Sequence, residues 1–164
     1  MRSLLLPAAK HRYAVGAFNF FGLENMQGIV LGAKEKKAPV IVQVSPGAVR
    51  HIGPKATVGM VSGYAEEMGV LVALHLDHAT DYAFICQCVD AGFTSVMIDA
   101  SKLPYAENIE QTARVVEYAS RKGVTVEAEL GMLGGAEEEV RVDKRDAFFT
   151  NPEDVPGFVE STGI

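Results

Sequence analysis

The feature that most constrains the fold is a repeated switch between two hydrophobic periods along the chain. Short apolar runs rich in β-branched residues, typical of buried strands, recur at 13–19, 38–44, 70–77, 94–99 and 124–130. Between these runs apolar residues recur at helical spacing, as Met26, Val30 and Ala33 do. Five such units, about 25 to 30 residues apart, predict a parallel sheet that is either open or closed into a barrel.

Polar residues stand at the end of nearly every predicted strand: Asn19, Ser45, Asp77, His78, Asp99 and Glu129. Closing the sheet gathers these ends at one mouth, where barrel enzymes place their chemistry. No glycine-rich phosphate loop follows the first strand, which argues against a dinucleotide-binding sheet. The expected fold is therefore an α/β structure, the (β/α)8 or TIM barrel.

Residues 1–164 are expected to form a single domain that supplies about the first five βα units of this barrel. A complete barrel of this kind needs about 250 residues. The remaining strands are therefore expected in a longer form of the protein or in a second polypeptide.

The charge and hydropathy of the chain exclude several classes of function. A formal net charge of −6 provides no basic surface for nucleic acid or for an anionic membrane. No apolar run approaches the roughly 20 residues of a membrane span, and the opening MRSLLLPAAK is too short and too interrupted for a signal peptide. We therefore expect a cytoplasmic protein that binds neither nucleic acid nor membrane.

The segment HLDHA, residues 75–79, is the most informative stretch of the sequence. Side chains three apart in a strand face opposite sides, so His75 and His78 are not expected to bind one metal ion together. His78 lies at the strand end, where it can turn inward as a metal ligand or remain a capped surface or core histidine. Asp77 ends an apolar strand, where burial and nearby cations tune its pKa as a general acid/base requires, although a helix N-cap or a turn fits the same spacing.

Other carboxylates offer further candidates. Glu127 and Glu129 lie two apart on one face of an apolar strand, where buried carboxylates require a metal, a lysine or an arginine as partner. Asp99 follows the fourth strand and fits either a metal ligand or a cap. The segment 131–139 combines glycines with glutamates, which is typical of a mobile flap that carries Glu137 to a substrate, or of a solvated acidic loop. No lysine lies in a predicted strand, so a Schiff-base lysine has no good candidate.

Taken together, several segments resemble the class II fructose-bisphosphate and tagatose-bisphosphate aldolase family over essentially the whole chain. The matching segments are GAFNF at 16–20, APVIVQVS at 38–45, HLDHA at 75–79, GFTSVMIDAS at 92–101, VEAELGMLGG at 126–135 and TNPED at 150–154. The resemblance implies reversible cleavage of a ketose 1,6-bisphosphate, fructose 1,6-bisphosphate first, to dihydroxyacetone phosphate and glyceraldehyde 3-phosphate. It also implies a homo-oligomer, either a dimer or a tetramer.

The resemblance assigns a role to each candidate residue. It implies that Asp77 is the catalytic aspartate and His78 the first ligand of a catalytic Zn²⁺. Asp99 and Glu129 correspond to a second, more buried divalent metal position, and the family also accommodates a monovalent cation. The remaining matches are the proton-transferring flap residue Glu137 and the substrate-pocket residues Asn19 and Ser45.

Three departures from the family pattern leave alternatives open. The other two zinc histidines and the phosphate sites of the family follow strands beyond Ile164. Lys102 replaces a histidine common after MIDAS, and Ala79 stands where glycine or histidine is usual, so a tagatose 1,6-bisphosphate aldolase is an alternative. A metal-free, phosphate-binding isomerase or synthase that uses Asp77 and Glu129, and an incomplete half-barrel with no activity of its own, also remain.

Overall fold

A single parallel sheet organises the chain. In the computed structural model, residues 1–133, 135–136, 141–142 and 148–164 are described. The strands, in chain order and also in spatial order, are β1 Ala17–Asn19, β2 Val40–Val44, β3 Val72–Ala79, β4 Ser95–Ile98 and β5 Thr125–Ala128. Every neighbouring pair is parallel. This confirms the predicted α/β class, with the strand order of the first part of a (β/α)8 barrel.

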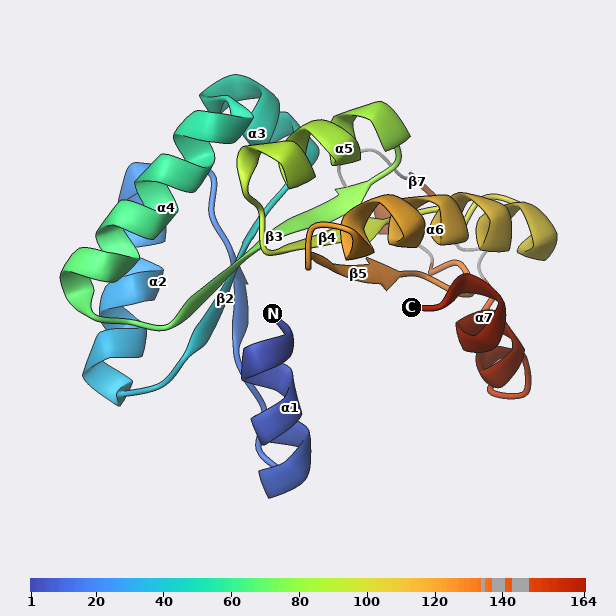
Figure 1. Cartoon of the computed structure of the whole chain (residues 1–164), viewed down its shortest axis with the longest axis horizontal. Coiled ribbons are helices and arrows are strands. Elements are labelled where there is room, and N and C mark those ends of the chain that lie inside the picture. The colour runs from blue at the N-terminus through green and yellow to red at the C-terminus, as the bar shows by residue number, and fades with distance from the viewer. Residues whose placement is uncertain (134, 137–140, 143–147) are drawn as a thin grey trace.

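Helices alternate with these strands along the chain. They are α1 Arg2–His11, α2 Leu23–Lys36, α3 Pro46–Ile52, α4 Pro54–Met68, α5 Tyr82–Ala91, α6 Tyr105–Ser120 and α7 Asp154–Thr162. Helices α2 to α6 lie along one side of the sheet, whereas α1 lies on the other side (Figure 1). Among the described residues, no helix combines the length and the apolar character that crossing a membrane requires.

The two sides of the sheet have different cores, because successive side chains of a strand point to opposite faces. On the helix-covered face, inward-packed aliphatic residues form the main cluster, which includes Val42, Leu74, Leu76 and Val96. On the opposite face, Leu4 of α1 packs against Ile41 and Ala73 in a small second cluster. We term this second face, opposite helices α2 to α6, the inner face of the sheet. Helix α1 covers only the part of it near the amino-terminal ends of the strands.

Glycines end two helices, and a turn sets the start of the last one. Gly69 and Gly92 end α4 and α5 in the left-handed conformation. The residues Asn151-Pro152-Glu153 have the residue types of a helix start, but α7 begins at Asp154. The reason is a turn, in which the carbonyl oxygen of Asn151 accepts from the Asp154 amide and its side-chain oxygen accepts from the Glu153 amide.

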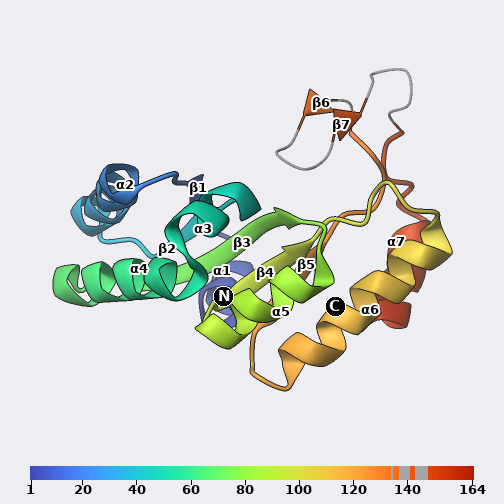
Figure 2. The ribbon, with the colours of Figure 1, turned by 90° about the horizontal axis from the view of Figure 1, so that it is seen from above.

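After the main sheet, two short strands, β6 Gly135–Ala136 and β7 Arg141–Val142, pair in antiparallel fashion as a small ribbon. Figure 2 shows this ribbon projecting from the side toward which the arrows of β3, β4 and β5 point. The described strands β6 and β7 therefore lie on the side of the sheet where the strands have their carboxyl ends. This is the end of the sheet where the sequence placed its candidate site residues.

Candidate active site

The end of β3 departs from regular strand geometry, and this departure brings Asp77 and His78 together. The register against β4 shifts between Leu76 and Ala79, and His78 has a φ of 49°. In a regular strand consecutive side chains face opposite sides. Here the left-handed His78 also turns inward, and its Nε2 lies 4.0 Å from Asp77 Oδ1. A left-handed conformation costs a non-glycine residue about 1–2 kcal/mol, so the surrounding contacts must offset that cost.

His78, Asp99 and Glu129 form a compact group that we term the carboxylate–histidine cluster. His78 Nδ1 lies 3.0 Å from Asp99 Oδ2 and 3.7 Å from Glu129 Oε2. One ligand atom from each residue falls within 4.8 Å of the others, and no second such group occurs in the part of the chain that the structure describes. One imidazole nitrogen and two carboxylate oxygens are a donor set that suits Zn²⁺. Two carboxylates held this close also favour a cation, so the residues fit a divalent metal.

Asp99 is held by more than His78. Its Oδ1 accepts hydrogen bonds from the Ser101 amide at 3.1 Å and from Ser101 Oγ at 2.6 Å. Burial acts to raise the pKa of Asp99, but hydrogen bonds from His78 and Ser101 outweigh it, and the pKa lies below its ordinary value. Asp99 is therefore a fixed, ionised carboxylate whose Oδ2 remains directed at His78.

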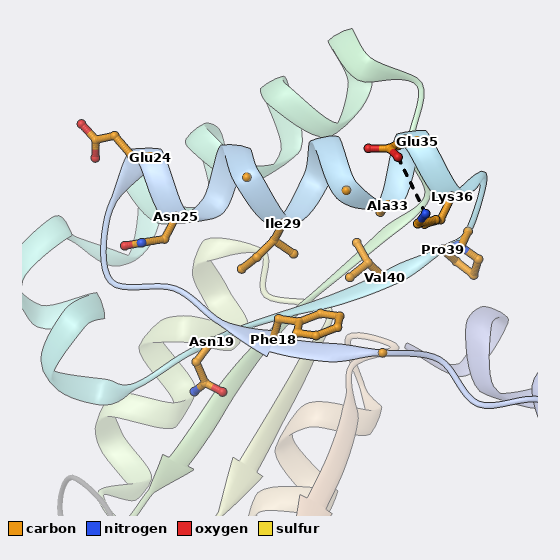
Figure 3. Close-up of a pocket in the computed structure, with 14 residues that line it drawn as sticks. Phe18, Asn19, Glu24, Asn25, Ile29, Ala33, Glu35, Lys36, Pro39 and Val40 are labelled. Atoms are coloured by element: carbon orange, nitrogen blue, oxygen red, sulfur yellow. Dashed lines mark ion pairs between the residues drawn. The ribbon is translucent and has the colours of Figure 1, made fainter.

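Asp77 lies beside the cluster and is oriented from β1. Asn19 Nδ2 donates to Asp77 Oδ2 at 2.6 Å. In Figure 3 the Asn19 side chain projects from β1 on the side opposite α2, toward the inner face of the sheet. The Asp77 side chain retains 15% exposure. A carboxylate fixed on one oxygen and still accessible can exchange a proton with a bound molecule.

Two buried residues of α6 support the end of β5 and were missed by the sequence analysis. Asn108 Nδ2 donates to the carbonyl oxygen of Glu129 at 2.8 Å, and Thr112 Oγ1 donates to Asn108 Oδ1 at 3.1 Å. Both side chains are fully enclosed. The available signal was a pair of polar residues, Asn108 and Thr112, four apart on the buried face of a helix.

The other predicted residues are less directly placed. Ser45 precedes α3 at the carboxyl end of β2, and its side chain makes no capping hydrogen bond there. Glu127 faces His75 and not the cluster, with 3.4 Å between Glu127 Oε2 and His75 Nε2. Glu137 lies outside the described residues, so its predicted role stays a prediction.

The pocket in Figure 3 is distinct from this cluster. It has a volume of about 820 Å³ and lies between α2 and the strands β1 and β2, lined by apolar groups such as Phe18, Ile29 and Val40. Of the site residues only Asn19 borders it, and Figure 3 shows that side chain directed away from α2. The pocket is therefore not where the candidate chemistry is placed.

Comparisons with known proteins bear on what this site does. The family described as fructose-bisphosphate aldolase class-II matches residues 1–164. A fructose-bisphosphate aldolase of Geobacillus stearothermophilus is 46% identical over 167 residues, covering 100% of this chain and 58% of that protein. The chain thus spans little more than half the length of this curated relative.

Solved structures give the same result for the fold. The crystal structure of a putative fructose-1,6-biphosphate aldolase from Coccidioides immitis aligns with a TM-score of 0.89 and 32% identity, covering 99% of this chain and 57% of that one. The YdjI aldolase from Escherichia coli K12 aligns with a TM-score of 0.82 and 31% identity, covering 99% of this chain and 60% of that one.

Proposed function

Because this chain belongs to the class II fructose-bisphosphate aldolase family, we propose that it carries the acid/base and part of the metal site of a metal-dependent aldolase. The proposed reaction is the reversible cleavage of fructose 1,6-bisphosphate to dihydroxyacetone phosphate and glyceraldehyde 3-phosphate. The observation that supports it best is the convergence of Asp77 with the carboxylate–histidine cluster at one end of the sheet. The proposal includes a cytoplasmic homo-oligomer and one domain over residues 1–164.

The residues have distinct tasks in this proposal. His78 is proposed as the first ligand of a catalytic Zn²⁺, and Asp99 and Glu129 as ligands of a second, more buried divalent metal position. When bound, the zinc supplies Lewis acidity toward a substrate carbonyl oxygen. No lysine of the described strands offers the alternative of a Schiff base.

Proton transfer is assigned to Asp77. In cleavage it accepts the proton of the C4 hydroxyl, the C3–C4 bond breaks, C4 becomes the aldehyde carbon and the electron pair passes to C3. In condensation Asp77 returns the same proton to the new hydroxyl. Asn19 holds the second carboxylate oxygen of Asp77, which fixes the direction of the accepting lone pair. Glu137 is proposed to move the proton at the nucleophilic carbon, and Ser45 to line the substrate pocket.

Tagatose 1,6-bisphosphate is the second candidate substrate. It differs from the fructose compound in configuration at C4, the carbon whose hydroxyl meets Asp77. Lys102 and Ala79 replace residues that are usual in the family at those sequence positions. The same catalytic residues serve either epimer.

The test is an assay of the full-length protein with each sugar bisphosphate, in which released triose phosphate is measured. We expect cleavage of fructose 1,6-bisphosphate, its loss on chelation and its recovery with Zn²⁺. Asp77→Ala is expected to abolish cleavage while the metal content remains unchanged. A matched control is Asp81→Asn, because Asp81 caps α5 on the same strand–helix connection and asparagine caps equally well.

Three results contradict the proposal. Cleavage of neither sugar excludes the aldolase activity, and undiminished turnover after chelation favours the metal-free isomerase or synthase alternative. Full turnover by the Asp77→Ala variant removes Asp77 from the reaction.

A further inference from the structure

A buried histidine beneath the candidate site has an unsatisfied nitrogen. His75 is 1% exposed and lies two residues before Asp77, on the same inward face of β3. Its Nδ1 lies 2.8 Å from Ser95 Oγ. Its Nε2 makes no hydrogen bond to any described residue. A buried polar atom without a hydrogen-bond partner destabilises the folded state, so this arrangement requires an explanation.

The group that faces this nitrogen is a carboxylate. Glu127 Oε2 lies 3.4 Å from His75 Nε2, and within the described ranges His75 forms an ion-pair contact with no other residue. The Glu127 side chain is 59% exposed. A small rotation of that side chain therefore completes a hydrogen bond without moving the enclosed ring.

The position of the ring proton follows from these two neighbours. With the proton on Nδ1, the Nε2 lone pair points at a carboxylate and is repelled. With the proton on Nε2, the ring donates toward Glu127, and the Ser95 hydroxyl donates to Nδ1. Both ring nitrogens are satisfied only in the second case. The doubly protonated ring is disfavoured, because burial lowers the pKa of His75 to about 4 although the Asp77 charge opposes this.

Glu127 is within electrostatic reach of the residues that the proposed reaction uses. The charges of Asp77 and His78 both act on the Glu127 carboxylate. Glu127 lies on β5, two residues before Glu129, which directly follows the strand and contacts His78. Where the Glu127 charge sits therefore changes the field at Asp77 and at His78.

We propose that His75 is a positioning residue, a neutral ring that is fixed by Ser95 and donates its Nε2–H to Glu127, holding that carboxylate beneath Asp77 and the carboxylate–histidine cluster. This inference rests on the proposed function for its effect on turnover. The chain of contacts Ser95, His75, Glu127 crosses three neighbouring strands, β4, β3 and β5, and so ties the inner face together below the site.

Two substitutions distinguish the contact made by Nδ1 of His75 from the contact made by Nε2. In His75→Gln the amide nitrogen can take the place of Nε2 and still donate to Glu127. In His75→Asn the shorter side chain reaches Ser95 but not Glu127. Both variants in the full-length protein remove the ring and leave a neutral amide, so they are matched in polarity.

The expected results distinguish positioning from packing. His75→Asn is expected to lower kcat and metal affinity by roughly tenfold with KM nearly unchanged, whereas His75→Gln retains most of both. In a Glu127→Gln background the His75→Asn substitution is expected to have no further effect, because its partner is already altered. Nitrogen-15 NMR of the imidazole in the parent protein should show the proton on Nε2. Metal affinity is measured by competition with a chelator, and urea unfolding checks that each variant is folded.

Three outcomes overturn the inference: a proton on Nδ1, equal losses in the Gln and Asn variants, or an undiminished effect of His75→Asn in the Glu127→Gln background. If the parent cleaves neither sugar bisphosphate, the proposed function fails instead. The NMR and metal-affinity measurements then still decide the role of His75, since neither depends on turnover.

Discussion

The two faces of the sheet use alternate residues of the same strands for opposite purposes. Leu74 and Leu76 of β3 lie under the helices in the main core, whereas His75 and Asp77, which alternate with them along the strand, point to the inner face. The helix-covered face is aliphatic along the strands. The inner face carries the small apolar cluster under α1, and polar residues such as His75 and Asp77 lie on it nearer the carboxyl ends of the strands. Residues that stabilise the core and residues of the candidate site thus alternate along the same strand. A substitution in the core should change stability with little effect on the site, and a substitution in the site should do the reverse.

The sharpest test of the inner face is removal of the histidine in the cluster. His78→Ala is expected to lower divalent-metal affinity by roughly a hundredfold or more, because it leaves two carboxylates without the nitrogen ligand. Competition with a chelator measures the change. His51→Ala serves as control, since His51 lies in the last turn of α3. Equal metal affinity in the His78 and His51 variants would exclude the cluster as the metal site.

The helix-covered face should respond in the opposite way. Leu76 is fully buried, so Leu76→Ala is expected to lower the free energy of unfolding by about 3 kcal/mol while metal affinity changes little. Leu71→Ala is the matched control, because Leu71 precedes the same strand and is 60% exposed. Urea denaturation gives both values. A comparable loss of metal affinity in the Leu76 variant would show that the two faces are coupled.

The buried His75 of the inner face should make the stability of the protein depend on pH. Its pKa falls from 6.5 to about 4 on folding, so the unfolded chain binds the proton more tightly. This contribution, about 3 kcal/mol, is fully present above pH 6.5 and is lost as the pH falls toward 4. The free energy of unfolding should therefore depend less steeply on pH between 6.5 and 4 in His75→Gln than in the parent protein. Urea denaturation at a series of pH values measures this dependence. Parallel pH dependences for variant and parent would contradict the buried neutral state.

The smallest expected effect concerns the backbone at His78. With a φ of 49°, this position suits glycine better than any residue with a Cβ. His78→Gly should therefore be about 1 kcal/mol more stable than His78→Ala, although both lose metal affinity. Urea unfolding of the two variants measures the difference. Equal stabilities would mean that the chain relaxes out of the left-handed conformation when the imidazole is removed.

Periodicity and strand-end polarity were sufficient to predict the parallel sheet and the gathering of site residues at one end. They were sufficient because burial imposes a period on each strand, and parallel strands end at one edge. The inward turn of His78 was left as one of two alternatives, since a register shift depends on pairing with β4 and not on local sequence. Helix α3 went unpredicted because seven residues are too few to establish a helical period. Asn108 could not be assigned, because its partner is a main-chain oxygen on another element.

Strands β1 and β5 are the outermost members of the sheet, each paired on one side only within the described residues. On the outer side of each of these strands, main-chain amide and carbonyl groups are not paired with another described strand. Such an edge is a ready template for a further strand, and it accepts one from a second copy as readily as from a correct neighbour. We therefore expect these 164 residues, at high concentration, to associate through the edges of β1 and β5.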